Sequence, residues 1–172
     1  MEEFERAFEK GNEFASGTGL LKSNGRWRLV VFPGNLGDNN TRTRYEKLGE
    51  ALGAPNSFIR RYTPRGKPFD SLIEVLTVHT GSRKDIDLLE LPETFHPNHG
   101  AMGWDYWKVY SDEESYHEGH GQAYRNYGID PNLGASVIIR PDQYISRIGE
   151  VDDYQMMLRF FGGFMVKQMS PS

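Results

Sequence analysis

Two pairs of histidines are the residues best suited to chemistry in this sequence. His96 and His99 lie in a stretch rich in proline, glycine and asparagine, and His117 and His120 are separated by Glu-Gly. Histidine titrates near neutral pH, so these side chains can serve as general acids and bases or as metal ligands. A three-histidine metal site would form if one residue of the second pair met the first pair in the folded chain.

A structural role for these histidines is the favoured interpretation. On a helix, His117 and His120 would lie on neighbouring faces and could reach one ion. His120 also falls on an apolar stripe with Tyr116, Ala123 and Tyr127, which favours a hydrogen-bonded and partly buried side chain. The other two histidines are in a loop, where side chains are mostly solvated. We therefore expect no bound metal and regard all four as weak catalytic candidates.

Four aromatic residues follow the first histidine pair. Trp104, Tyr106, Trp107 and Tyr110 alternate along the chain, so one side of this stretch is expected to pack inward. Exposed aromatic side chains would suit a protein interface or a phenolic ligand. A plain core is the favoured interpretation, and a binding surface is the alternative.

The run Arg140-Pro141-Asp142, followed by Tyr144, is typical of a tight turn after a buried strand. Proline fixes φ at such a position. Asp142 can accept main-chain N–H groups within the turn, and Arg140 can pair with an acidic neighbour. The motif therefore predicts structural roles.

Composition excludes several classes of function. The 172 residues include no cysteine, which excludes disulfides, thiolate nucleophiles and cysteine-bound zinc. A net charge of −4 does not suit a nucleic-acid partner. The apolar runs are too short to span a membrane and the acidic N-terminus is no secretory signal, so a cytoplasmic protein is expected. Gly17-Thr18-Gly19 follows an expected helix and lacks a third glycine, so no flavin or other cofactor is expected.

The expected elements mix helices with strands. Apolar residues at helical spacing, β-branched runs and Gly, Pro or Asn breaks define them. In chain order they are a helix at 2–15, a strand at 27–32, a helix at 41–52, a short strand or helix within 54–70, a strand at 72–80, an irregular segment at 92–104, a strand at 106–110, a helix from Ser111 or Asp112 to about Tyr127, hairpin strands at 134–140 and 143–148, and a helix from Asp152 or Asp153 onward.

This order joins a βαβ half to a hairpin half, which is the layout of a thioredoxin-like sheet. We predict an α/β protein with a central mixed β-sheet flanked by helices, ending in a β-hairpin and a helix. Residues 1–22 are expected to form an N-terminal helix and joining segment, and residues 23–172 the domain itself.

Several stretches resemble the C-terminal domain of FAD-dependent phenol 2-monooxygenases. They are YHEGHGQAY at 116–124, NYGIDP at 126–131, GASVIIRPDQY at 134–144, and RLVVFPG at 28–34. The run FASGTG at 14–19 is similar to the segment that joins the flavin domain to that domain, although a stretch usual in the family is missing between Leu21 and Arg26.

The resemblance implies a thioredoxin-like fold without a redox pair and a role in dimer formation. In the family, the flavin and phenol sites lie in upstream domains, and nothing in this sequence corresponds to them. Monooxygenase activity is therefore not expected from this chain alone.

Three functional hypotheses follow. The leading one is a non-catalytic interaction module that forms a homodimer or binds a flavin monooxygenase partner. The second is a small cofactor-free isomerase, cyclase or hydrolyase acting on phenolic or polyketide-derived molecules, with the histidines or tyrosines as acid–base groups. A closed, aromatic-lined pocket holding at least two of these groups would favour the enzyme. The third is a truncated product of a longer gene.

Overall fold

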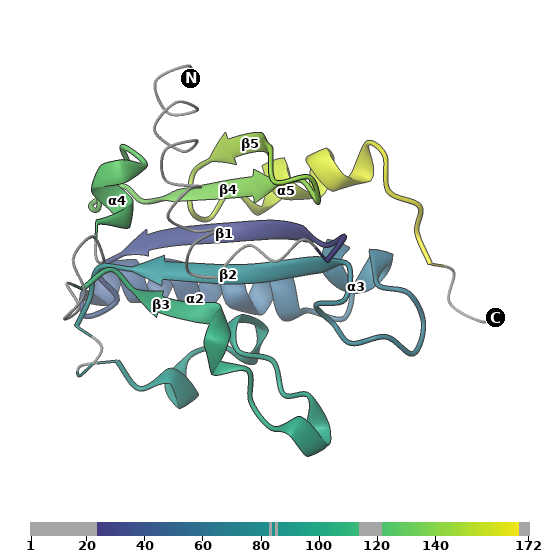
Figure 1. The fold of residues 1–172 in the computed structure, drawn as a ribbon, viewed down its shortest axis with the longest axis horizontal. Coiled ribbons are helices and arrows are strands. Elements are labelled where there is room, and N and C mark those ends of the chain that lie inside the picture. The colour runs from purple at the N-terminus through teal and green to yellow at the C-terminus, as the bar shows by residue number, and fades with distance from the viewer. Residues whose placement is uncertain (1–23, 83, 85, 114–121, 169–172) are drawn as a thin grey trace.

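A five-stranded sheet forms the centre of the computed structural model, which describes residues 24–82, 84, 86–113 and 122–168. The strands lie in the order β3-β2-β1-β4-β5 (Figure 1). Their bounds are β1 (Trp27–Gly34), β2 (Ile73–His79), β3 (Val109–Ser111), β4 (Ala135–Ile139) and β5 (Ile145–Gly149).

The half of the sheet that comes first in the chain is parallel. β1 pairs with β2, Leu29 opposite Val75, and β2 pairs with β3 in the same direction. Parallel neighbours need a crossover connection, and α2 (Asn39–Gly53) supplies it between β1 and β2. The Asp38 carboxylate caps this helix by accepting the main-chain N–H of Thr41 at 2.9 Å.

The other half is antiparallel, because β4 runs against both β1 and β5. In the turn between β4 and β5, the main-chain N–H of Arg140 donates to the carbonyl of Tyr144 at 2.8 Å. The Arg140 guanidinium donates to Asp142 Oδ2 at 2.6 Å, and the main-chain N–H of Tyr144 donates to Asp142 Oδ1 at 3.4 Å. These contacts hold the hairpin turn closed, while the Tyr144 ring remains exposed.

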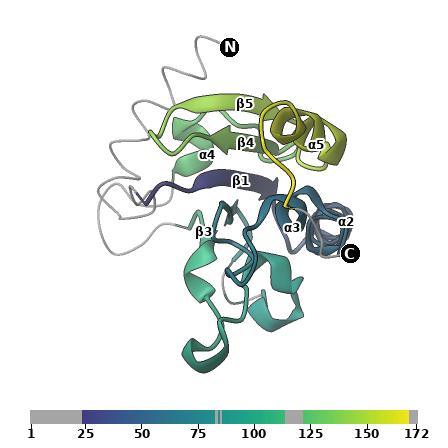
Figure 2. The ribbon, with the colours of Figure 1, turned by 90° about the vertical axis from the view of Figure 1, so that its right-hand side faces the viewer.

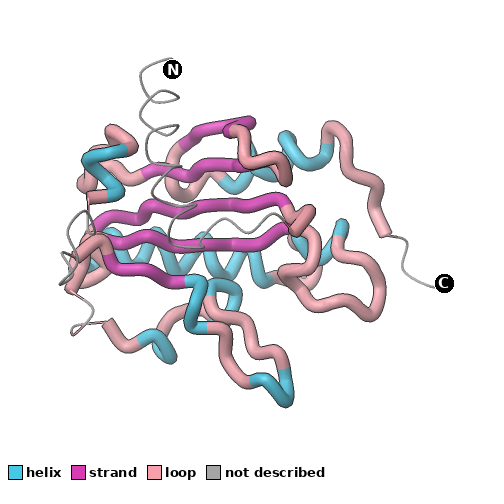
Figure 3. Tube along the Cα trace, viewed as in Figure 1, coloured by secondary structure: helices cyan, strands magenta, loops and turns pink. Residues whose placement is uncertain are grey.

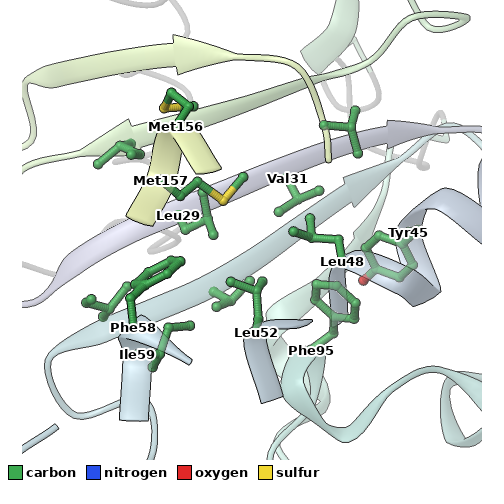
Figure 4. Packing of buried hydrophobic residues seen from close by; sticks show 14 of the residues in the cluster. Leu29, Val31, Tyr45, Leu48, Leu52, Phe58, Ile59, Phe95, Met156 and Met157 are labelled. Atoms are coloured by element: carbon green, nitrogen blue, oxygen red, sulfur yellow. The ribbon is translucent and has the colours of Figure 1, made fainter. Parts of the chain in front are cut away.

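Three helices cover one face of the sheet. In the view of Figure 2, α2, α3 (Phe58–Tyr62) and α5 (Tyr154–Gly162) lie on the same side of the strands. Their apolar side chains meet those of the sheet in one buried cluster, part of which is drawn in Figure 4. Within it, the rings of Phe58 and Phe161 stack with centroids 5.2 Å apart. This cluster is the main core.

A second apolar cluster lies on the opposite face. α4 (Ala123–Asn126) contributes Tyr124, whose ring meets that of Phe32 edge-on at a centroid separation of 5.4 Å. The Tyr124 hydroxyl donates to the carbonyl of Val78 at 2.8 Å and accepts the N–H of Gly34 at 2.7 Å. One buried phenol therefore joins the ends of β1 and β2. Helices on a mixed sheet with a βαβ half and a hairpin half confirm the predicted α/β class, and the arrangement agrees with a thioredoxin-like domain.

The prediction of a strand at 106–110 is wrong for its first three residues. Tyr106–Lys108 forms a 3-10 turn, and β3 begins only at Val109. The turn forms because the Asp105 carboxylate accepts the main-chain N–H of Trp107 at 3.1 Å.

The helix predicted from Asp112 to Tyr127 also differs. Asp112 follows β3 directly, and its carboxylate accepts the main-chain N–H groups of Ala123 at 2.6 Å and Tyr124 at 3.2 Å. It therefore binds the first turn of α4 from a distance in sequence. Residues 114–121, the middle of the predicted helix, and residues 1–22, the predicted N-terminal helix and joining segment, lie outside the described residues.

The connection between β2 and β3 projects beyond the β3 edge of the sheet in both ribbon views. It includes the segment predicted to be irregular at 92–104. Four 3-10 turns interrupt it (Figure 3): Leu88–Glu90, Glu93–Phe95, Gly100–Met102 and Tyr106–Lys108.

Candidate functional site

A buried lysine lies where this projecting segment joins the sheet. Lys108 Nζ lies 2.5 Å from Glu74 Oε1 on β2, 2.9 Å from Asp70 Oδ2 just before β2, and 3.4 Å from Asp105 Oδ2. The side chains of Lys108 and Asp70 are only 4% and 3% exposed. One ammonium thus binds three carboxylates from two separate parts of the chain.

Further cations surround these carboxylates. Arg26 Nη1 lies 3.1 Å from Asp70 Oδ2, and Arg28 Nε lies 3.1 Å from Glu74 Oε2. His99 Nε2 approaches the carboxylates of Asp70 and Asp105 at 3.8 and 3.6 Å. We call the set of Arg26, Arg28, Asp70, Glu74, His99, Asp105 and Lys108 the ion cluster.

The ion cluster holds its central groups in their charged forms. Burial lowers the pKa of Lys108, but its bonds with Glu74 and Asp70 outweigh burial and raise that pKa above its usual value. Burial likewise raises the pKa of Asp70, while the bond and charge of Lys108, with Arg26 and His99, bring it below its usual value. A lysine kept as an ammonium is no nucleophile or base, so the cluster is suited to holding the projecting segment in place.

The ion cluster is poorly suited to binding a metal. One ligand atom from each of Asp70, His99 and Asp105 lies within 4.8 Å of the others, the spacing at which an ion could bind. However, Lys108 Nζ is already 2.9 Å from Asp70 and 3.4 Å from Asp105. The ammonium supplies the positive charge that a metal ion would bring.

The two loop histidines have different partners. His96 is buried, and its Nε2 lies 2.8 Å from the carbonyl oxygen of Leu91. Its ring packs near Trp104, with centroids 5.2 Å apart. His99 instead belongs to the ion cluster. His117 and His120 lie outside the described residues, so a site that joins the two pairs stays a prediction.

A fifth histidine was missed by the sequence reasoning. His79, at the end of β2, is buried, and its Nδ1 has no hydrogen-bond partner among the described residues. A signal was present, since Ile73, Val75, Thr77 and His79 alternate along β2 and share the face that packs on the main core.

His79 is expected to make stability depend on pH. Burial lowers the pKa of His79 despite a main-chain hydrogen bond at Gly81 and the charge of Glu113. The unfolded chain therefore binds a proton first, so stability is complete above about pH 6.5 and falls as the pH drops toward the folded pKa. We expect the wild type to lose at most about 1.4 kcal/mol per pH unit in this window through this residue.

Denaturant unfolding of the wild type and His79→Asn between pH 7.5 and 5.5 measures this effect. The substitution should flatten the pH dependence, whatever it does to stability at pH 7.5. Parallel curves for the two proteins would show that His79 does not titrate as described.

The projecting segment also borders a surface pocket of about 530 Å³. It opens between this segment and the ends of α2 and α3, and its lining includes Arg60, Phe69, Glu93, Asn98, His99 and Met102. Of the two catalytic candidates that the structure describes, His96 and His99, only His99 is among the lining residues. The Arg60 guanidinium stacks on the Phe69 ring at 5.0 Å and donates to the Gly53 carbonyl at 2.9 Å. Within the described part of the chain, the pocket therefore brings together no acid–base pair from the predicted set.

A second hollow of about 470 Å³ lies where β1 and β2 end and α2 begins. Ligands of open α/β sheets bind at such strand ends. Its charged lining residue is Arg42, which is already bound to Glu46 and Glu90, both at 2.9 Å. The other described residues of its lining are neutral and include Asn35, Gly37, Asn39, Thr80 and Ser82.

The aromatic residues of the projecting segment do not form a core, contrary to the favoured interpretation. Trp104, Tyr106 and Trp107 are exposed, and Tyr110 is half-buried with its hydroxyl donating to the carbonyl of Trp107. Burial raises the pKa of Tyr110 to about 12, so it stays protonated. Because these rings are exposed, the alternative hypothesis of a binding surface for a protein or a phenolic ligand is the one to test.

Over residues 14–169 the chain matches the family described as phenol hydroxylase, C-terminal dimerisation domain. It belongs to this family.

Curated relatives of this dimerisation domain are described as monooxygenases. The chain is 42% identical to the FAD-dependent monooxygenase terD of Aspergillus terreus over 86% of its own length and 24% of that protein. It is 38% identical to the phenol 2-monooxygenase fsqG of Aspergillus fumigatus, over 82% of the chain and 22% of the relative. It is 31% identical to the 3-hydroxybenzoate 4-monooxygenase of Comamonas testosteroni, over 84% of the chain and 22% of the relative. The chain thus spans less than a quarter of the length of these relatives.

The FAD named in the description of terD does not fit the dimerisation domain as the structure describes it. The connection from β1 to α2 reads Pro33-Gly34-Asn35-Leu36-Gly37-Asp38, which lacks the glycine spacing of a dinucleotide-binding turn. Gly34 is required there for another reason, since a Cβ on it would lie 2.3 Å from the carbonyl oxygen of Pro131. The close approach at this turn is to the protein's own main chain.

Proposed function

We propose that the chain is a non-catalytic dimerisation module in which two copies associate. The observation that carries the proposal is the match to a dimerisation-domain family across residues 14–169, almost the whole chain. A family that is described as a dimerisation domain favours an interaction role.

The described side chains support a role without catalysis. His96 is hydrogen-bonded to a main-chain carbonyl, His99 lies between two carboxylates, and Lys108 is held as an ammonium. General acid–base chemistry needs groups that converge on a substrate position. Arg60 and His99 at the first hollow and Arg42 at the second are already engaged with other groups of the protein.

The mass of the purified chain in solution tests this function. Light scattering coupled to size-exclusion chromatography should give about twice the monomer mass of 19.7 kDa at micromolar concentration. A constant monomer mass up to high concentration would remove the proposal. In the same preparation, incubation with FAD, NADPH and phenol should leave NADPH unoxidised, and steady NADPH consumption would contradict a non-catalytic role.

A flavin monooxygenase is the second candidate partner. The chain is 42% identical to a segment of terD, and this likeness supports the pairing of one copy of this chain with the matching domain of such a relative. Co-expression of this chain with such a monooxygenase, followed by mass analysis of the complex, tests this pairing.

Among the described residues, no helix has the length and apolar character needed to cross a bilayer. The cytoplasmic location and the phenolic ligand expected from the sequence stay predictions.

A further inference from the structure

An exposed apolar surface is concentrated in a short stretch of the projecting segment. Between positions 102 and 107, Met102 is 85% exposed, Trp107 82%, Tyr106 43% and Trp104 38%. We call these four side chains the exposed platform. Tryptophan, tyrosine and methionine are the residue types enriched at the centres of protein interfaces. Large apolar side chains left in water at this density mark an interaction surface.

The exposed platform is fixed in position before any partner arrives. Asn98 and Trp104 form a β-bridge, and the main-chain N–H of His99 donates to the carbonyl of Gly103 at 2.9 Å. The main-chain N–H of Asp105 donates to the carbonyl of Pro97 at 3.0 Å. Below this small hairpin, Lys108 ties the segment to Asp70 and Glu74 of the sheet region. Little conformational entropy would then be lost on binding.

Charge on this stretch suits a second copy of the same surface. In a twofold-symmetric dimer, residues near the axis face their own copies, so an unpaired charge there repels itself. From Pro97 to Trp107 the formally charged residue is Asp105, apart from a histidine. Its carboxylate is engaged from within, 3.4 Å from Lys108 Nζ and 3.6 Å from His99 Nε2. The platform therefore presents apolar groups without an uncompensated acid or base.

The area is of the size that a dimer interface needs. From the usual surface of such side chains, the platform exposes on the order of 500 Å². A standard interface buries about 800 Å² on each partner, with an apolar centre and a polar rim. The platform would supply the centre, and the adjoining turn around Asn98 and Gly100 would supply part of the rim.

Other large exposed apolar side chains of the described region are more scattered. Leu133 precedes β4, whereas Tyr144 follows it at the opposite end of that strand. Phe164 packs against Trp27, with ring centroids 5.0 Å apart. Leu89 and Val166 are also exposed, Val166 two positions from Phe164. In the described part of the chain, 102–107 is the stretch that carries four large exposed apolar side chains within six residues.

We propose that two copies of this chain associate through the exposed platform, with Trp107 and Met102 at the centre of the interface. This inference rests on the proposed function, because it names the surface used for dimerisation.

The test compares dimer dissociation constants from sedimentation velocity over a concentration series. The variants are Trp107→Ala and Met102→Glu, and the matched control is Tyr144→Ala, which removes another largely exposed ring, in the turn between β4 and β5. Each platform variant should weaken the dimer by at least about 30-fold, the loss typical of an interface hot spot, while the control keeps the wild-type constant. Circular dichroism and melting temperature verify that each variant is folded.

The outcomes separate the surface from the function. A dimeric wild type with folded, monomeric Met102→Glu supports the platform, and Met102 is so exposed that its replacement is not expected to affect folding. If the wild type is dimeric and the platform variants stay dimeric, the proposed surface is wrong and the proposed function still stands. Loss of the dimer in Tyr144→Ala would contradict the platform and place the interface at the turn between β4 and β5. A monomeric wild type overturns the proposed function itself.

Discussion

Replacing Lys108 with methionine is expected to lower the free energy of unfolding by about 3 kcal/mol at pH 7, the range seen when one member of a buried ion pair is removed. Lys108 and Asp70 are almost completely buried, so the Asp70 carboxylate would remain in the protein interior with Arg26 as its closest cation. Methionine keeps a similar length, so the loss would report the charge rather than the packing. Urea unfolding of the wild type and Lys108→Met measures it.

The pH dependence of this loss distinguishes an ionic cause from a packing cause. The folded pKa of Asp70 is lowered in the wild type, so its contribution is present above about pH 3.9 and is lost as the pH falls through the folded pKa. In Lys108→Met the buried carboxyl would take up a proton more readily, so the gap between the two proteins should narrow from pH 7 to pH 4. Lys47→Met, at an exposed position of α2, serves as the control and should leave stability unchanged within about 0.5 kcal/mol. A gap that does not change with pH would argue against the ionic account of the cluster.

Gly34→Ala is expected to lower the free energy of unfolding by about 3 kcal/mol, because the substitution has two separate destabilising effects at this residue. Gly34 has a φ of +97°, which L side chains rarely adopt. A Cβ there would also lie 2.3 Å from the carbonyl oxygen of Pro131, a main-chain atom that cannot rotate away. Thermal and urea unfolding of the purified variant measure the cost.

Gly66→Ala separates the two penalties. Gly66 also has a positive φ of +69°, yet a Cβ added there meets nothing within 4 Å. Its replacement should therefore cost only about 1 kcal/mol, the penalty for the left-handed conformation. Equal losses in the two variants would contradict the close approach between β1 and the residues before β4.

The parts of the fold that could be predicted from the sequence are those with strong local periodicity. The βαβ half follows from two β-branched runs around a helix with a clear apolar stripe, and the hairpin follows from a buried run, a proline turn and a partner run. Each signal is contained within the element that it predicts, so distant contacts do not alter it.

The errors lie where distant contacts decide the local structure. The alternating rings of the stretch ending at Tyr110 resemble a strand. The local cap from Asp105 to the N–H of Trp107 and the distant bond from Lys108 to Asp70 make a 3-10 turn instead. Asp112 is a good helix cap by type, yet it binds the N–H of Ala123 across an intervening segment. The pairings of Lys108 with Asp70 and of Asp112 with Ala123 join distant positions, so the local sequence does not reveal them.

The candidate site was also only partly predictable. The sequence drew attention to the histidines, whereas the central group of the ion cluster is Lys108, whose partners are 34 and 38 residues away in the chain. The exposed aromatics were expected to be core because they alternate along the chain, which favours one side packing inward. They are exposed because the segment that carries them projects past the edge of the sheet.

Self-association is tested most directly by subunit exchange followed by native mass spectrometry. Unlabelled and uniformly ¹⁵N-labelled chains are mixed at equal concentration and equilibrated. We expect three dimer masses in a 1:2:1 ratio, the middle one carrying one chain of each kind. Monomer masses alone, at every concentration up to the solubility limit, would contradict dimerisation.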